Sequence, residues 1–128
     1  MKDILPHQRK VVNIRDESAY TPSGDGEEGT SFIQLNPDAE KFVGFYIYRM
    51  APGAQSTPHL HPGAEEFLVV EGELTDNDGT TYRTGDVVWL AGGTEHTSHS
   101  ESGCIVAVYS ETRESAPGTG NGQEKYHE

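Results

Sequence analysis

The apolar residues of this chain occur in short runs separated by glycine- and proline-rich turns, and this pattern most limits the folds available to it. The runs are rich in aromatic and β-branched residues, which favour strands. They cover residues 42–50, 67–74, 87–91 and 104–109. No stretch repeats apolar residues at i, i+3, i+4 and i+7 over several turns, as an amphipathic helix would. We therefore expect an all-β domain, an antiparallel sandwich or barrel.

The turn residues and the two ends of the chain divide this domain further. The sequence DNDG at residues 76–79 predicts a hairpin between strands. Signals are weaker over residues 1–40, which we expect to form edge strands, at residues 10–14 and 30–35, or an arm that extends a neighbouring subunit's sheet in a homodimer. Residues 113–128 are rich in glycine and polar residues and predict a flexible tail. The remainder, residues 1–112, is expected to be a single domain.

Charge and composition exclude several classes of partner. The 128 residues include 9 Lys and Arg against 21 Asp and Glu, a net charge of −12. Such a surface repels phosphate backbones and anionic lipids, so neither nucleic acid nor a membrane is expected as a partner. The single cysteine, Cys104, excludes an intrachain disulfide and fits a core position. Without an apolar signal stretch at the N-terminus, the chain is expected in the cytoplasm.

A cluster of polar residues interrupts the strand pattern at residues 57–72, TPHLHPGAEEFLVVEG. On a strand, His59 and His61 face the same side because one residue separates them. A tight turn after them returns the chain, so Glu65 can reach the same space. Two imidazoles and a carboxylate that converge suit a divalent metal, and His96, after a later glycine turn, is the candidate fourth ligand. A His-x-His pair alone is more often a surface or structural feature, so the prediction depends on all four residues.

The first part of this pattern resembles a known motif. Gly53, His59, His61, Glu65 and Gly72 match the first cupin motif, G-x5-HxH-x3-E-x6-G, at every defined position. The interval to the last glycine favours Glu65 over its neighbour as the ligand.

Residues 85–100 match a second cupin motif, G-x5-P-x-G-x2-H-x3-N, at some but not all of its defined positions. Gly85, Gly93 and His96 match it, whereas Ala91 stands at the usual proline and Ser100 at the usual asparagine. Together the motifs span residues 53–72 and 85–100. The resemblance implies the cupin double-stranded β-helix, a jelly-roll barrel of antiparallel strands, with one divalent metal ion per chain. The departures fall on turn positions and leave the four ligand positions intact.

The region after the histidines is most similar to the cupin domain of the zinc-binding anti-sigma factor group and its stand-alone relatives. Some of those relatives are similar to non-haem dioxygenases. The anti-sigma proteins also carry a separate Cys/His-rich zinc domain. With one cysteine and no room for such a domain, the chain is not expected to share the anti-sigma role.

Five further residues are candidates for lining a small-molecule pocket. The two tyrosines alternate with apolar neighbours, so one pair is expected to face the pocket and the other a sheet or a subunit. The phenylalanine and tryptophan are expected first of all in the core. The histidine is a candidate partner of the metal ligands or a pocket base, and a solvated strand-end histidine is the more frequent alternative. These candidates are Tyr46, Tyr48, Phe67, Trp89 and His99.

Three functions are compatible with these residues. The first is a non-haem metal-dependent dioxygenase that acts on a small oxygenated organic compound. The second is a zinc-binding module that binds or senses a small ligand without catalysis. The third is a metal-assisted isomerase or lyase, which needs a base in the pocket. Imidazole and carboxylate ligands suit iron, zinc, nickel, manganese and copper alike, so the sequence leaves the metal open.

Overall fold

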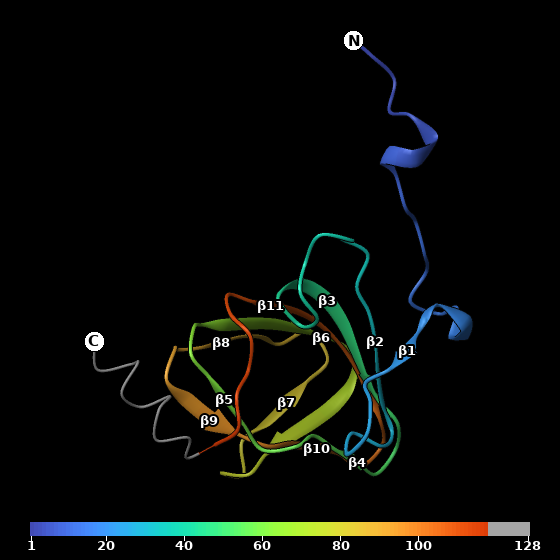
Figure 1. The fold of residues 1–128 in the computed structure, drawn as a ribbon. Helices are drawn as coiled ribbons and strands as arrows, with labels where there is room; N and C mark the ends of the chain where they lie inside the picture. The colour runs from blue at the N-terminus through green and yellow to red at the C-terminus, as the bar shows by residue number, and fades with distance from the viewer. Residues whose placement is uncertain (118–128) are drawn as a thin grey trace.

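The computed structural model describes residues 1–117, which fold into an antiparallel β-barrel of jelly-roll type (Figure 1). The all-β fold expected from the sequence is confirmed. The first elements are two short 3-10 helices, η1 (Pro6–Gln8) and η2 (Glu17–Ala19), and three strands, β1 (Thr21–Pro22), β2 (Thr30–Ile33) and β3 (Gly44–Met50). The next are β4 (Ala54–Gln55), β5 (His59–His61), β6 (Glu65–Asp76) and β7 (Thr81–Arg83). The last are β8 (Val87–Leu90), β9 (Thr94–His96), β10 (Ser98–Ser100) and β11 (Cys104–Ser110).

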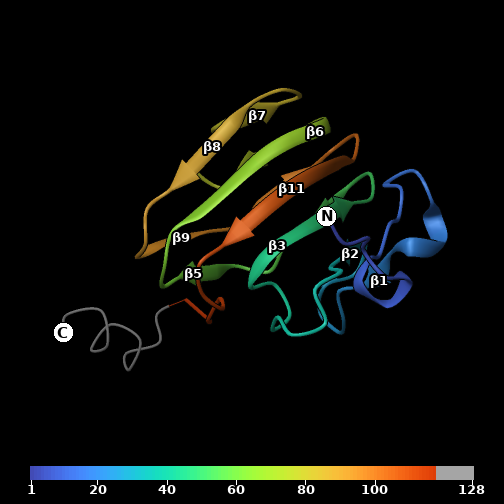
Figure 2. The same ribbon diagram turned by 90° about the horizontal axis from the view of Figure 1, so that it is seen from above.

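The long strand β6 organises the sheets. The main sheet has the order β1-β2-β3-β11-β6-β10-β4, and all its pairs are antiparallel. On β6, residues 65–68 pair with β8 and residues 73–75 pair with β7, which confirms the hairpin predicted at DNDG. Figure 2 shows β8, β6, β11 and β3 side by side in one layer. Strands β5 and β9 form a separate two-stranded sheet that carries the histidines.

The core lies inside the barrel and follows the alternation of the strands. On β3, Tyr46 and Met50 are buried while Phe45 faces solvent, as the two-residue period of a strand requires. Side chains of the neighbouring strands β11 and β6 pack beside them on the inner face of the same sheet. The buried cluster consists of Tyr46, Met50, Ala54, Phe67, Val69, Leu74, Cys104, Val106 and Val108.

Gly72, the last residue of the first motif, lets β6 and β11 approach closely. Its φ of +78° lies in a region that side chains rarely adopt, and a Cβ there would lie 2.1 Å from the Gly103 carbonyl oxygen. The β6–β11 register shifts next to this contact, between Ile105 and Val106. The glycine of the motif therefore has a structural role, because it permits a bulge at the crossing of the two strands.

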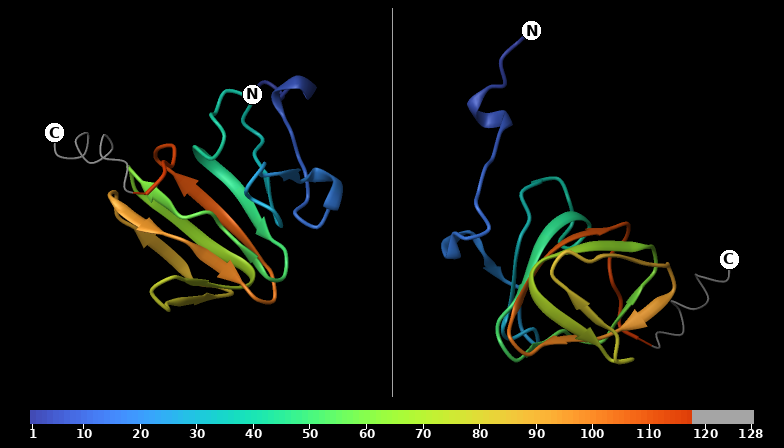
Figure 3. Two further views of the ribbon diagram at one scale, coloured as in Figure 1. Left: turned by 60° about the horizontal axis from the view of Figure 1, so that its bottom comes forward. Right: turned by 180° about the vertical axis from the view of Figure 1, so that it is seen from behind.

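The two ends of the chain differ in how they pack. Residues 30–33 form β2, whereas residues 10–14 form no strand. Arg15 and Glu17 form ion pairs with Glu71 and Arg49 of the barrel, whereas the first residues of the chain extend away from it (Figure 3). At the other end Ser115 pairs with Leu60 of β5, and residues 118–128 of the predicted tail lie outside the described residues. Within residues 1–117 no helix has the length and apolar character needed to cross a membrane.

Candidate metal centre

The three motif histidines face one another across the small sheet of β5 and β9. His59 and His96 are direct partners in the antiparallel register. His61 lies on the same side of β5 as His59, while Leu60 points the opposite way and is buried. The ring centres of the three histidines lie 4.5 to 4.9 Å apart. Their ligand nitrogens lie within 4.8 Å of one another and could hold a metal ion.

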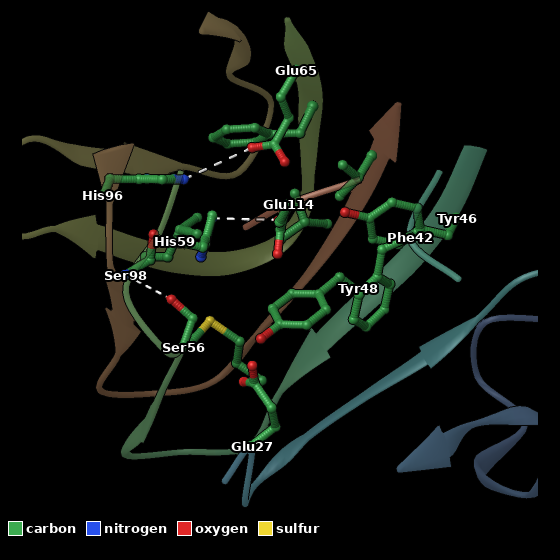
Figure 4. Close-up of a pocket in the computed structure, with 15 residues that line it drawn as sticks. Glu27, Phe42, Tyr46, Tyr48, Ser56, His59, Glu65, His96, Ser98 and Glu114 are labelled. Atoms are coloured by element: carbon green, nitrogen blue, oxygen red, sulfur yellow. Dashed lines mark hydrogen bonds and ion pairs between the residues drawn. The ribbon is translucent and has the colours of Figure 1, made fainter. Parts of the chain in front are cut away.

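Glu65, the first residue of β6, completes the group. The turn after His61 reverses the chain, so the Glu65 carboxylate enters the same space (Figure 4). Its Oε2 atom lies 3.5 Å from Nδ1 of His61, and its Oε1 atom lies 4.0 Å from Nε2 of His96. Glu65 is buried, whereas the adjacent Glu66 is exposed on the outer face. The structure thus brings all four predicted ligands together.

Hydrogen bonds fix which ring nitrogens point into the site. Nδ1 of His59 donates to the Thr57 carbonyl oxygen at 2.8 Å, and Nδ1 of His96 donates to Oδ1 of Asp76 at 2.9 Å. In the neutral state both rings then present an unprotonated Nε2 to the site, the arrangement that metal-binding histidines usually show. Nε2 of His96 lies 2.9 Å from Nε2 of His61. Two nitrogen lone pairs this close are stabilised by a shared proton or cation, so the donor set fits a metal ion.

The electrostatic environment keeps two of the imidazoles neutral. Burial, opposed by the hydrogen bond to Thr57, lowers the pKa of His59 to about 4. Burial, together with the neighbouring His59 and His96, lowers the pKa of His61 to about 3. Both rings are therefore unprotonated near neutral pH, which is the state that binds a metal.

Asp76 orients His96 and was not identified from the sequence. Besides His96, it accepts hydrogen bonds from the hydroxyls of Ser98 and, at 2.7 Å, Tyr82. Burial alone would raise the pKa of Asp76, but these three hydrogen bonds outweigh it and lower that pKa. Its turn-like neighbours, DNDG, identified it only as a hairpin residue.

The comparison with known families covers most of the chain. Residues 7–113 match the family model described as the ChrR cupin-like domain. The chain belongs to the ChrR cupin-like family. No curated protein matches it in sequence.

Solved structures share the fold of this cupin at low sequence identity. An acetylacetone dioxygenase from Acinetobacter johnsonii has 16% identity and a TM-score of 0.65, with 84% of this chain and 75% of that chain covered. A candidate acetylacetone dioxygenase from Methylibium petroleiphilum has 12% identity and a TM-score of 0.69, with coverages of 91% and 88%. The structure of Rhodobacter sphaeroides SigE in complex with the anti-sigma ChrR gives 23% identity and a TM-score of 0.58, with 70% of this chain and 46% of that chain covered. These likenesses show the fold alone.

The candidate metal centre of this cupin opens onto a cavity of about 60 Å³ with an apolar wall inside the barrel (Figure 4). That volume leaves room for an ion and a ligand of a few non-hydrogen atoms. The apolar wall comes from β3, β6 and β11, while β5, β9 and the segment after β11 contribute His59, His96 and Glu114. The lining residues are Glu27, Phe42, Tyr46, Tyr48, Met50, Ser56, His59, Glu65, Phe67, Leu74, His96, Ser98, Val106, Val108 and Glu114.

Two of the five candidate pocket residues lie elsewhere. Tyr46, Tyr48 and Phe67 line the cavity. Trp89 does not, and it is not a core residue either, because it is 64% exposed on the outer face of β8. The register of β8 explains this, since its inward positions pair with Glu65 and Phe67 and leave Trp89 opposite the outward Glu66. His99 is likewise exposed, between two buried serines of β10, and has the solvated position that was the alternative for it.

Glu114 is a cavity residue that the sequence did not indicate, because it falls in the segment expected to be a tail. Its Oε2 atom lies 3.4 Å from Nε2 of His59. Burial raises the pKa of Glu114 to about 7, and burial together with the Glu114 charge raises the pKa of Glu65 to about 8. Ser110 donates to Oε2 of Glu65 at 3.3 Å and holds that carboxylate against the barrel wall.

Proposed function

We propose that this cupin is a non-haem metal-dependent enzyme of dioxygenase type that acts on a small oxygenated organic compound, such as a β-diketone or a hydroxyketone. The observation that supports this most is the convergence of three imidazoles and the Glu65 carboxylate beside a cavity with an apolar wall. His59, His61, Glu65 and His96 would hold one divalent ion. Iron(II) bound there would supply Lewis-acid and oxygen-activating chemistry.

The other residues of the site have roles that can be stated from their contacts. Asp76 orients His96, and Ser110 holds Glu65. Phe67, with the aliphatic residues of the cavity wall, would exclude water from the ligand and fix its orientation. The small volume favours compounds of a few carbon atoms. The shared fold with an acetylacetone dioxygenase agrees with this substrate class.

Oxygen uptake tests the proposal directly. The natively purified protein is first analysed for its metal content and then loaded anaerobically with iron(II). Oxygen consumption is recorded with a panel of small diketones and hydroxyketones, and the products are identified by mass spectrometry. We expect uptake with at least one compound, and its loss in the double variant His59→Ala/His61→Ala. Retained metal without turnover across the panel would overturn the enzymatic proposal, and turnover without oxygen consumption would indicate an isomerase or lyase instead.

A zinc-binding module that senses a small ligand is the second candidate. The observation that favours it is the membership of the ChrR cupin-like family, together with a likeness to a chain in the SigE complex with the anti-sigma ChrR. This candidate predicts tightly held zinc, no oxygen uptake, and a shift in thermal unfolding when a small carbonyl compound is added to the zinc-loaded protein.

We also propose that the chain forms a homodimer through its exposed sheet layer. Five apolar side chains on β3, β6, β8 and β11 form what is called here the outer apolar face: Phe45, Leu68, Val87, Trp89 and Tyr109. Tyr109 pairs directly with Phe45 and Leu68 with Val87, while Glu66 lies between Trp89 and Tyr109 on the same face. Several exposed large apolar side chains gathered on one face are typical of a protein interface.

A second copy of this chain could cover two exposed apolar surfaces, the outer apolar face and the N-terminal arm. The N-terminal arm, residues 1–14, also leaves apolar side chains exposed: Met1, Ile4, Leu5, Val11 and Val12. In a two-fold dimer each copy can offer its arm and its outer apolar face to the other, so that both are covered by one symmetric contact.

A further inference from the structure

Glu114 reaches the candidate metal centre from a segment that belongs to neither cupin motif. Its carboxylate lies within 4.8 Å of ligand atoms of His61 and Glu65, and its Oε2 atom is 3.4 Å from Nε2 of His59. Figure 4 shows the side chain pointing into the cavity, with its dashed contact to His59. The potential ligands form two groups that share His61. One consists of His59, His61 and His96, and the other of His61, Glu65 and Glu114.

The register of the backbone accounts for this position. Leu60 and Ser115 form an antiparallel bridge. The Leu60 nitrogen lies 2.8 Å from the Ser115 carbonyl oxygen, and the Ser115 nitrogen lies 3.0 Å from the Leu60 carbonyl oxygen. Since neighbouring side chains alternate in direction, Glu114 faces the side of β5 that carries His59 and His61. The segment after β11 thus acts as a third strand beside β5, opposite β9, and adds a carboxylate to the histidine face.

Further hydrogen bonds fix the segment to the turn that follows the histidines. Oε1 of Glu111 accepts from the Ala64 amide and Oγ1 of Thr112 accepts from the Gly63 amide, both at 2.8 Å. The Glu111 amide donates to the Ala64 carbonyl oxygen at 3.1 Å. Backbone and side-chain contacts therefore hold the chain on both sides of Glu114, at residues 111–112 before it and at Ser115 after it. These contacts set the position of the Glu114 carboxylate.

The charges in the cavity call for a cation near Glu114. Among residues 1–117, those that line the cavity include three carboxylates, Glu27, Glu65 and Glu114, and neither lysine nor arginine. Two ionised carboxylates that face each other in a buried site are unfavourable unless a positive charge lies between them. A divalent ion with three neutral imidazoles and Glu65 keeps a net charge of +1, whereas adding Glu114 brings the site to zero.

We propose that Glu114 is a fifth protein ligand of the metal centre, delivered by the strand-like segment that pairs with β5. This inference rests on one part of the proposed function, the binding of a metal ion by His59, His61, Glu65 and His96. It applies equally to an enzyme and to a sensing module. Three nitrogen and two oxygen donors would favour iron(II) or manganese(II) over copper(I), and on an octahedral ion they leave one position for an exogenous ligand.

Cobalt(II) binding tests the proposal without any activity measurement. The wild-type chain, Glu114→Gln and the control Glu27→Gln are titrated with cobalt(II), and zinc affinity is measured by competition with a chelator. Glu27 is a matched control because its carboxylate lines the same cavity but belongs to neither ligand group. We expect Glu114→Gln to weaken metal binding by about 10–100-fold and to intensify the visible cobalt(II) bands, since fewer ligands give a geometry closer to tetrahedral. Glu27→Gln should match the wild type in both measurements.

Thermal unfolding of the metal-free proteins separates a ligand from a structural residue. Without a metal the Glu114 carboxylate is a buried, unbalanced acid, so metal-free Glu114→Gln should be at least as stable as the wild type. Unchanged affinity in Glu114→Gln would overturn the proposal, and so would weaker binding with an unchanged cobalt(II) spectrum. If His61→Ala loses cobalt(II) while Glu114→Gln retains it, only the fifth ligand is refuted. If the wild type binds no metal, the proposed function fails as well.

Discussion

Asp76 accepts a hydrogen bond from Nδ1 of His96 at 2.9 Å, and this contact turns Nε2 of His96 toward His61 and Glu65. Asp76 is also the last residue of β6, where the chain enters the hairpin to β7. One side chain therefore ends a strand and orients a candidate ligand. The same carboxylate accepts hydrogen bonds from Ser98 and Tyr82, so its position is fixed from three sides.

Asp76→Asn is expected to weaken metal binding by about 10–100-fold, the usual effect of removing the partner of a metal-bound histidine. The amide no longer supplies the charge that holds the Nδ1–H tautomer of His96. Chelator competition with zinc measures the loss. Asp78→Asn is the matched control, since Asp78 is exposed in the same hairpin and its side chain accepts a hydrogen bond from the Thr80 amide rather than from a histidine. Equal affinities in the two variants would contradict the positioning role of Asp76.

The metal-free protein is expected to lose stability as the pH rises from 6.5 to 8. Burial raises the pKa of Glu65 to about 8 and that of Glu114 to about 7, so in this range the folded chain binds protons that the unfolded chain has released. Groups whose folded pKa is raised stabilise the fold at low pH, and that stability is lost as the pH rises through the folded pKa. The free energy of unfolding should fall by about 2 kcal/mol over this range.

Other titrating groups do not reverse that trend. The pKa values of His59 and His61 are lowered, so the stability they contribute is complete above pH 6.5 and is lost only in more acidic solution. Burial would lower the pKa of His96, but the hydrogen bond and charge of Asp76 raise it overall, which adds to the loss above pH 6.5. Urea unfolding of the chelator-treated protein at both pH values measures the effect. Glu65→Gln should make the free energy of unfolding fall less steeply with pH. A metal-free wild type that gains stability as the pH rises would refute the raised pKa values of Glu65 and Glu114.

The sequence predicted the parts of this protein that depend on local spacing. His59, His61 and Glu65 lie within one strand–turn–strand unit, and their convergence follows from strand parity and a short turn. Glu114 and Asp76 act through contacts with residues 55 and 20 positions away. Their roles depend on which strands lie side by side, and local spacing carries no such information.

Trp89 shows the same limit from another side. Alternation along β8 predicts that Trp89 and its neighbour Val88 face opposite ways, but it does not say which of them faces inward. The pairing of Val88 with Phe67 sets that choice and places the tryptophan outside. A large aromatic residue was therefore assigned to the core on hydrophobicity alone, whereas the sheet register exposes it.

Gly72→Ala is expected to lower the free energy of unfolding by at least about 3 kcal/mol, because its Cβ would overlap backbone atoms of β11. Gly79→Ala separates this overlap from backbone strain. Gly79 has a similar φ of +89°, against +78° for Gly72, yet no atom lies within 4 Å of the Cβ that would be added. Its substitution should therefore lower the free energy of unfolding by only about 1–2 kcal/mol. Urea unfolding of both variants measures the difference, and equal losses would show that the contact between Gly72 and Gly103 relaxes.

Trp89→Ser is expected to shift the proposed homodimer toward monomer by raising its dissociation constant about 10–100-fold, since buried tryptophans dominate the energy of many interfaces. Trp89 lies on the outer apolar face, where Glu66 of β6 stands between it and Tyr109. Leu35→Ser is the matched control, because Leu35 is an exposed apolar residue after β2 and outside this face. Sedimentation velocity over a range of protein concentrations gives the dissociation constants of the wild type and both variants. A wild type that stays monomeric at every concentration, or a dimer equally strong in Trp89→Ser, would show that a second copy does not cover this face.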